Sequence, residues 1–190
     1  MKIGFDGIVI AESTKGSLRA LTKRQVYLAL AKTIPDASGN MIANPNKTWK
    51  DVDSSLPNMK IEVLGPPPTS GTRDSFAELY MEPGCGKDDK KLCTAIREDG
   101  VYIEAGENDN VIIQKLAANP NALGIFGFSY LEQNHGKIKG LSIDGVEPTF
   151  ETISSAKYTA SRALFVYIKK QHLAAIPGLK EFVQEYVSDK

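Results

Sequence analysis

Apolar residues along this chain fall into two kinds of segment, which differ in length and in the spacing of their apolar positions. Short apolar or alternating runs bounded by turn residues predict strands at 3–10, 60–65, 100–105, 122–128, 137–143 and 162–170. Longer segments with apolar residues three or four apart predict helices at 21–34, 71–81, 111–120, 129–135 and 177–187. Because strands and helices alternate throughout, the pattern predicts an α/β fold.

Two of the expected helices have local start signals. Thr22 occupies an N-cap position and Gln25 follows three residues later, which is a capping-box pattern. Pro177 suits the first turn of the last helix. The expected apolar faces are Val26, Ala29, Leu30 and Thr33 in the first helix, and Leu179, Phe182, Val183, Tyr186 and Val187 in the last. Residues 36–58, around Trp49, predict a structured loop with short turns.

Composition narrows the class of protein. With 190 residues, 42% apolar and 24% charged, the chain resembles a soluble globular protein of one domain or two small ones. Its 23 basic and 23 acidic residues leave no net charge, and no basic stripe indicates nucleic-acid binding. No apolar run approaches the ~18 residues that a membrane helix needs. Asp6 interrupts the apolar N-terminal stretch, which predicts a strand and a turn rather than a secretory signal.

Cys85 and Cys93 are the two cysteines of the chain. Their number and spacing do not suit a structural zinc site, which takes four ligands. They fit either a local disulfide bond or two free thiols beside a helix, and the sequence leaves both open. A disulfide would imply an oxidising compartment.

The segment "GPPPTSGTRDSF" (65–76) combines a strand end, three prolines and the start of a helix. Amide groups in the first turn of a helix are unpaired and attract anions. Ser70 and Thr72 add hydroxyl donors, Gly71 allows close approach to the backbone, and Arg73 adds a bidentate cation. Prolines at 66–68 would hold this arrangement rigid before a ligand arrives. The segment predicts an anion-binding site; the alternative is an ordinary N-cap with a solvated Arg73–Asp74 pair.

A second polar turn, "GENDN" (106–110), precedes the helix expected at 111–120. Asn108, Asp109 or Asn110 would cap that helix. Glu107 or Asp109 would also be placed to accept hydrogen bonds from Arg73 or from ligand hydroxyls. Thr69 and Asp74, which flank the first motif, complete the secondary binding candidates.

The sequence lacks the residues that a P-loop, a metal site or a catalytic site requires. The run "GCGKDDKK" is not a phosphate-binding P-loop, because Asp88 stands where a hydroxyl is needed. His135 and His172 lie in different elements without metal-ligand spacing. Asp88 and Asp89 are expected on a solvated face. With no visible nucleophile, general base or metal site, the sequence predicts neither an enzyme nor a metal or cofactor.

Six segments together resemble one family. "IGFDGIVIA", "LTKRQVYLALAKTIP", "TWKDVD", "IEVLGPPPTSGTRDSF", "NPNALGIFGFSYL" and "YTASRALFVYIKK" follow one another as in the phosphate-binding proteins of high-affinity phosphate ABC transporters. The resemblance covers essentially all of the chain. It implies a periplasmic-binding-protein-like lobe, with a mixed, mostly parallel sheet flanked by helices. It also implies that Ser70, Gly71, Thr72 and Arg73 bind inorganic phosphate, and that a transporter permease is a partner.

The family's proteins have two lobes, and this chain resembles the second one. Residues 1–190 are expected to form that single lobe, with 1–10 and 160–190 as hinge strands and a remnant of the first lobe. The first-lobe aspartate that accepts a proton from phosphate has no counterpart here, which predicts a half-site with weak, poorly selective oxyanion affinity. The alternative is a lobe that acts through self-association, as a homodimer, or with a partner lobe. The resemblance implies the periplasm; with Met1 as the natural start, the cytoplasm is expected.

Overall fold

A six-stranded sheet forms the centre of the fold in the computed structural model, which describes residues 1–86 and 90–188. Five strands follow one another across the sheet in the order β10 (Ser161–Phe165), β1 (Lys2–Ser13), β7 (Leu123–Gly127), β5 (Val63–Gly65) and β6 (Tyr102–Glu104). The sixth, β8 (Ile138–Gly140), also pairs with β1. Because β1 is antiparallel to β7, β8 and β10, whereas β5 is parallel to β6 and β7, β1 opposes the other five strands. The prediction of a mixed, mostly parallel sheet is confirmed.

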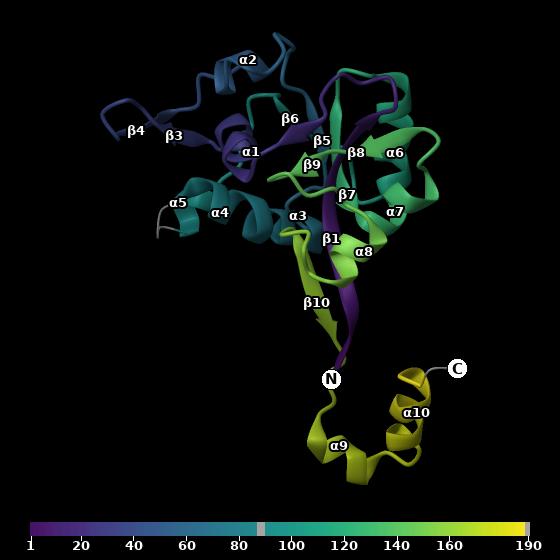
Figure 1. Cartoon of the computed structure of the whole chain (residues 1–190). Coiled ribbons are helices and arrows are strands. Elements are labelled where there is room, and N and C mark those ends of the chain that lie inside the picture. The colour runs from purple at the N-terminus through teal and green to yellow at the C-terminus, as the bar shows by residue number, and fades with distance from the viewer. Residues whose placement is uncertain (87–89, 189–190) are drawn as a thin grey trace.

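Helices flank this sheet on two sides. The α-helices of the described chain are α1 (Lys23–Leu30), α2 (Trp49–Val52), α3 (Gly71–Phe76), α4 (Glu82–Cys85), α5 (Lys90–Thr94), α6 (Asp109–Ala118), α7 (Phe128–Gln133), α8 (Phe150–Ser154), α9 (Lys170–Ala175) and α10 (Leu179–Tyr186). Two small strand pairs lie outside the sheet, β2 (Ala20–Leu21) with β9 (Ser142–Ile143) and β3 (Thr33–Pro35) with β4 (Met41–Ala43). Figure 1 shows α6 and α7 on one side of β1 and β7, and α1, α3 and α4 on the other. Among the described residues, no helix is long and apolar enough to cross a membrane.

The core lies between the sheet and these helices. A side chain at Gly124 of β7 would meet Leu116 and Ile112 of α6 at 2.6 and 2.8 Å, so glycine allows this helix to approach the sheet closely. On β1, the carbonyl of Ile8 accepts a hydrogen bond from the buried hydroxyl of Tyr80 at 2.8 Å. The hydroxyls of Tyr80 and Tyr158 lie 2.8 Å apart, so these two buried hydroxyls are paired with each other.

Helix α1 has the predicted start but ends earlier than predicted. Thr22 and Gln25 form the capping box through both of its hydrogen bonds. The helix ends at Leu30 instead of near residue 34, and Thr33 belongs to β3 rather than to the helical face. Thr33 and Ile34 pair with Ala43 and Ile42 of β4. Pairing with a strand of the 36–58 region therefore ends the helix earlier than the spacing of apolar residues predicts.

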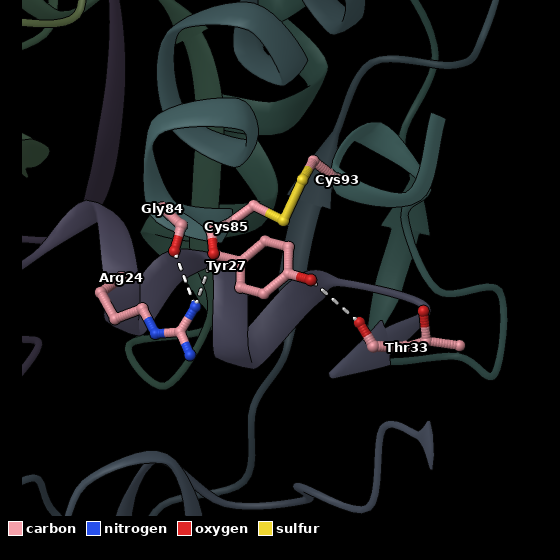
Figure 2. The surroundings of a disulfide bond; sticks show 6 residues. All are labelled: Arg24, Tyr27, Thr33, Gly84, Cys85 and Cys93. Carbon is pink, nitrogen blue, oxygen red and sulfur yellow. Dashed lines mark hydrogen bonds between the residues drawn. A yellow bond between two sulfur atoms is a disulfide. The ribbon is translucent and has the colours of Figure 1, made fainter. Parts of the chain in front are cut away.

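A long helical run connects the candidate site to the cysteines. Helix α3, a π-helical segment Ala77–Met81 and α4 form one continuous helix from Gly71 to Cys85, longer than the predicted 71–81. Cys85 and Cys93 form a disulfide bond with a Cα–Cα distance of 5.4 Å. Arg24 of α1 donates hydrogen bonds to the carbonyls of Gly84 and Cys85 (Figure 2). These contacts fix the end of the helix that lies opposite the candidate site.

The chain differs from the prediction most after residue 160. The strand expected at 162–170 ends at Phe165. The last backbone hydrogen bonds that join it to the β1 segment are those between Val166 and Met1, so the residues after Val166 have no strand partner there. Helix α9 follows, and α10 begins at Leu179 rather than at Pro177. No residue of α9 or α10 is buried, and Figure 1 shows both helices beyond the far end of the β1–β10 ribbon. Asp88 and Asp89, expected on a solvated face, lie outside the described residues.

Candidate anion-binding site

The candidate site lies at the carboxyl end of β5, where the chain turns into α3. The amide of Ser70 donates to the carbonyl of Pro67 at 3.0 Å, which closes the turn that follows the prolines. The side-chain oxygen of Ser70 then accepts from the amide of Thr72 at 3.2 Å, so Ser70 is the N-cap of the helix. The amide of Arg73 also donates to the carbonyl of Ser70 at 3.0 Å. Three of the four backbone amides of residues 70–73 are therefore engaged with protein groups. We call residues Ser70–Arg73 the seat.

Gly71 supplies the open position of the seat. Within the described part of the chain, its amide donates to no protein acceptor. A β-carbon built on Gly71 has no heavy atom within 4 Å, and the backbone of Gly71 is not among the positive-φ glycines. Neither conformation nor packing therefore requires glycine here. The open side of Gly71 leaves room for a ligand to approach the backbone closely.

The side chain of Arg73, the last residue of the seat, is held firmly in place. Its guanidinium lies 4.3 Å from the centre of the Tyr102 ring and donates to the carbonyl of Pro66 at 3.2 Å. The hydroxyl of Tyr102 donates to the same carbonyl at 2.7 Å, and burial raises the pKa of Tyr102 to about 12, so this donor stays protonated at neutral pH. Only 13% of the Arg73 side chain is exposed. A hydrogen bond from this guanidinium to an anion is therefore poorly screened by water.

Two glutamates lie near the seat, Glu104 at the end of β6 and Glu107 after it. The Glu104 carboxylate lies 3.9 Å from Nη1 of Arg73, and its side chain is half exposed. The Glu107 carboxylate accepts a hydrogen bond from the hydroxyl of Thr69 at 2.8 Å. Because β5 and β6 are parallel, with Gly65 opposite Glu104, the segments that follow both strands meet at one edge of the sheet.

The remaining acidic candidates lie apart from the seat. Asn108 is the cap of α6 and accepts from the amide of Asn110 at 3.0 Å, which leaves Asp109 in the first turn. Burial raises the pKa of Asp109, and the nearby Asp6 carboxylate raises it further. Asp74 is exposed in the first turn of α3. Among the described residues, no hydrogen bond or ion pair joins the carboxylate of either aspartate to the seat.

The sequence predicted the seat residues, Thr69 and Glu107 as binding candidates, but not Tyr102 and Glu104, which lie beside Arg73. Neither residue stands in a polar motif, since both belong to the apolar run of β6. A signal was available in principle, because parallel neighbouring strands place their carboxyl ends side by side. That signal requires knowing that β5 and β6 are neighbours, which the sequence alone does not give.

A separate groove of about 680 Å³ lies over α7, β8 and the start of α8 and includes no seat residue. Its lining carries Arg19 and Lys139 but also Glu132 and Glu147, and Lys139 lies 3.2 Å from the buried carboxylate of Glu12. With both signs of charge present, the groove has no preference for anions. Within the described residues, no group of three His, Cys, Asp or Glu side chains could hold a metal ion.

The comparisons with known proteins agree with this geometry. A family model for the PBP superfamily domain matches residues 1–190, so the chain belongs to the PBP superfamily. Among curated relatives, the phosphate-binding protein PstS of Staphylococcus haemolyticus (strain JCSC1435) is 32% identical over 195 residues, covering 100% of this chain and 53% of that protein. This chain therefore spans about half the length of the curated relatives it matches. The resemblance to phosphate-binding proteins is confirmed.

Solved structures give the same result. A protein of Planctomyces limnophilus DSM 3776, described as a possible phosphate binding protein, superposes with a TM-score of 0.74 at 26% identity and covers 100% of this chain and 61% of its own. PstS of Borrelia burgdorferi superposes with a TM-score of 0.65 at 22% identity, covering 97% of this chain and 69% of its own. At that identity the second match bears on the fold alone.

Proposed function

We propose that this chain binds inorganic phosphate at the seat, as part of the substrate-binding component of a phosphate ABC transporter. The observation that carries the proposal is that the Gly71 amide has no protein acceptor among the described residues, two positions before Arg73, whose guanidinium is fixed. A tetrahedral oxyanion there would also receive hydrogen bonds from the hydroxyls of Ser70 and Thr72. The names of the relatives, phosphate-binding proteins, support the same ligand. A transporter permease is the corresponding partner, and no catalytic role is proposed.

The seat supplies half of a phosphate site in this proposal. We take residues 1–190 as the second lobe of a two-lobe binding protein, with 1–10 and 160–190 as hinge strands and part of the first lobe. The exposed helices α9 and α10, connected to the sheet through the β1–β10 ribbon, support this division (Figure 1). Hydrogen bonds to a charged ligand contribute about 1.5–3 kcal/mol each. The half-site alone should therefore bind weakly, in the millimolar range or above.

The decisive test is substitution of Gly71 by alanine. The structure has room for the added methyl group, so the fold should stay intact, but the methyl group would crowd a ligand that approaches the backbone of Gly71 closely. We expect Gly71→Ala to weaken phosphate binding at least about tenfold. Binding is measured by following the amide signals of residues 70–73 in NMR titrations of the whole chain with phosphate.

Gly136→Ala is the matched control, because Gly136 also has no heavy atom within 4 Å of a built β-carbon and lies outside the seat. It should bind phosphate like the parent chain. Equal binding by Gly71→Ala and the parent would contradict the seat as the phosphate site. Absence of any saturable shift in the parent would contradict the proposed function itself.

A second candidate function is self-association, which the exposed apolar residues of α10 favour. Phe182 and Tyr186 lie on one face of this helix and are 68% and 61% exposed. We expect the chain to form a homodimer at high micromolar concentration if this face pairs with a second copy. Sedimentation velocity of the parent and of a Phe182→Ser, Tyr186→Ser double variant tests this. A parent that stays monomeric at every concentration excludes the candidate.

We also propose the periplasm as the compartment, following the resemblance. The Cys85–Cys93 disulfide supports an oxidising environment. If the chain were cytoplasmic, the same two residues would be reduced thiols.

A further inference from the structure

The guanidinium of Arg73 is engaged at one nitrogen and open at the other two. Its Nη1 atom donates to the carbonyl of Pro66 at 3.2 Å, and the hydroxyl of Tyr102 donates to the same carbonyl at 2.7 Å. The Tyr102 ring covers one face of the guanidinium, with 4.3 Å between the ring centre and Cζ of Arg73. Among the described residues, the Nε and Nη2 atoms of Arg73 donate to no protein acceptor. The edge formed by Nε and Nη2 is therefore the one left for a ligand.

We infer that Tyr102 is a positioning residue of the anion site, which holds Arg73 so that Nε and Nη2 are presented together to two oxygens of one oxyanion. The inference deepens the proposed function and rests on it, because it concerns the anion bound at the seat. Tyr102 acts through Arg73, since its own hydroxyl is already used by the carbonyl of Pro66.

Gly65 makes this arrangement possible. A β-carbon built on Gly65 would lie 2.1 Å from the hydroxyl oxygen of Tyr102 and 2.5 Å from Cζ of its ring, separations that real β-carbons do not show. Gly65 is not among the positive-φ glycines, so its backbone conformation does not require glycine. The missing side chain instead lets the Tyr102 hydroxyl lie against the backbone, within hydrogen-bond distance of Pro66. Glycine at 65 and tyrosine at 102 therefore fit each other.

The effect on binding follows from the shape and freedom of an arginine side chain. A guanidinium is a planar fork whose neighbouring N–H groups match two oxygens of one oxyanion. A free arginine loses much rotamer freedom when it makes both bonds, and that loss weakens binding. The aromatic ring and the Pro66 carbonyl restrict the Arg73 side chain before a ligand arrives. Tyr102 therefore lowers the ordering cost of binding without touching the ligand.

The test replaces Tyr102 in two ways and measures binding of inorganic phosphate by NMR titration of the whole chain, at constant pH and ionic strength. The Gly71 amide and the Nε–H group of Arg73 are followed together, and in the parent both should report one dissociation constant. Tyr102→Leu removes the ring and the hydroxyl, so phosphate affinity should fall about tenfold. The phosphate-induced shift of the Arg73 Nε–H signal should shrink relative to that of Gly71. Tyr102→Phe keeps the ring, so it should lose only about two- to threefold.

Tyr27→Leu is the matched control. Tyr27 is also fully buried, its ring centre lies 5.4 Å from Cζ of Arg24, and its hydroxyl donates to the carbonyl of Thr33 at 3.2 Å. A packing defect of the same kind, away from the seat, should leave the phosphate affinity and the Arg73 signal as in the parent. Equal losses of affinity in Tyr27→Leu and Tyr102→Leu would mean that Tyr102 contributes packing alone.

The remaining outcomes separate this inference from the proposed function. Parent-like affinity in Tyr102→Leu, or a loss of affinity with an unchanged Arg73 Nε–H signal, would overturn the positioning role and leave the proposed function standing. If Tyr102→Leu does not fold, Tyr102→Phe decides, and parent-like affinity together with a parent-like Arg73 signal overturns the role. If the parent shows no saturable phosphate shift at residues 70–73, both proposals are wrong.

Discussion

Replacing Arg73 by alanine is expected to weaken phosphate binding by about ten- to a hundredfold. The estimate corresponds to loss of one charge-assisted hydrogen bond of about 1.5–3 kcal/mol. The effect should lie toward the upper end, because Arg73 is only 13% exposed and is oriented by Tyr102 before the ligand arrives. Isothermal titration calorimetry or NMR titration with phosphate measures it.

Arg73→Lys and Arg19→Ala complete this experiment. Lysine keeps the charge but loses the planar fork and the ring contact with Tyr102, so an intermediate affinity is expected. Arg19 is exposed and outside the seat, so its removal changes the net charge equally and should leave affinity unchanged. Equal losses in Arg73→Ala and Arg19→Ala would mean that net charge, rather than the seat, attracts the anion.

The elements nearest the seat were the most predictable from sequence. The N-cap at Ser70, the helix that follows and the strand before it all carry strong local signals, and local hydrogen bonds realise them. Local sequence signals do not show which strands are neighbours in the sheet. Tyr102 and Glu104 lie beside Arg73 because β6 pairs with β5, and no sequence motif indicates that these two strands pair. The local structure of residues 70–73 was therefore predictable, whereas the residues that contact the Arg73 side chain were not.

The errors elsewhere have a related cause. The apolar run at 162–170 has strand character throughout, but a strand exists only where a partner is available, and β10 ends with the pairing to β1. In the same way, Thr33 has the spacing of the first helix but finds a partner in β4. Propensity and periodicity predicted the kind of element well, and tertiary pairing decided its length.

Arg97→Met is expected to lower the free energy of unfolding by about 3 kcal/mol, a large effect for one residue. The Arg97 side chain is 3% exposed, and its Nη1 atom donates to the carbonyls of Ala29 and Asn46 at 3.2 and 2.8 Å. Its Nη2 atom donates to the carbonyl of Asn44 at 3.2 Å. Methionine fills much of the volume but leaves these buried acceptors without a donor. Urea unfolding followed by the fluorescence of Trp49, the one tryptophan, measures the change.

The pH dependence of stability tests whether Arg97 stabilises the fold through its interaction with Asp99 or only through packing. Hydrogen bonds from Arg97, and then from Lys47, hold the pKa of Asp99 well below its usual value. A carboxyl group with a lowered folded-state pKa stabilises the fold above its unfolded pKa of about 3.9, and this contribution is lost as the pH falls toward the folded value. The parent should therefore lose stability more steeply than Arg97→Met between about pH 4 and pH 2. Parallel losses in the two proteins would show that Arg97 acts through packing rather than through Asp99.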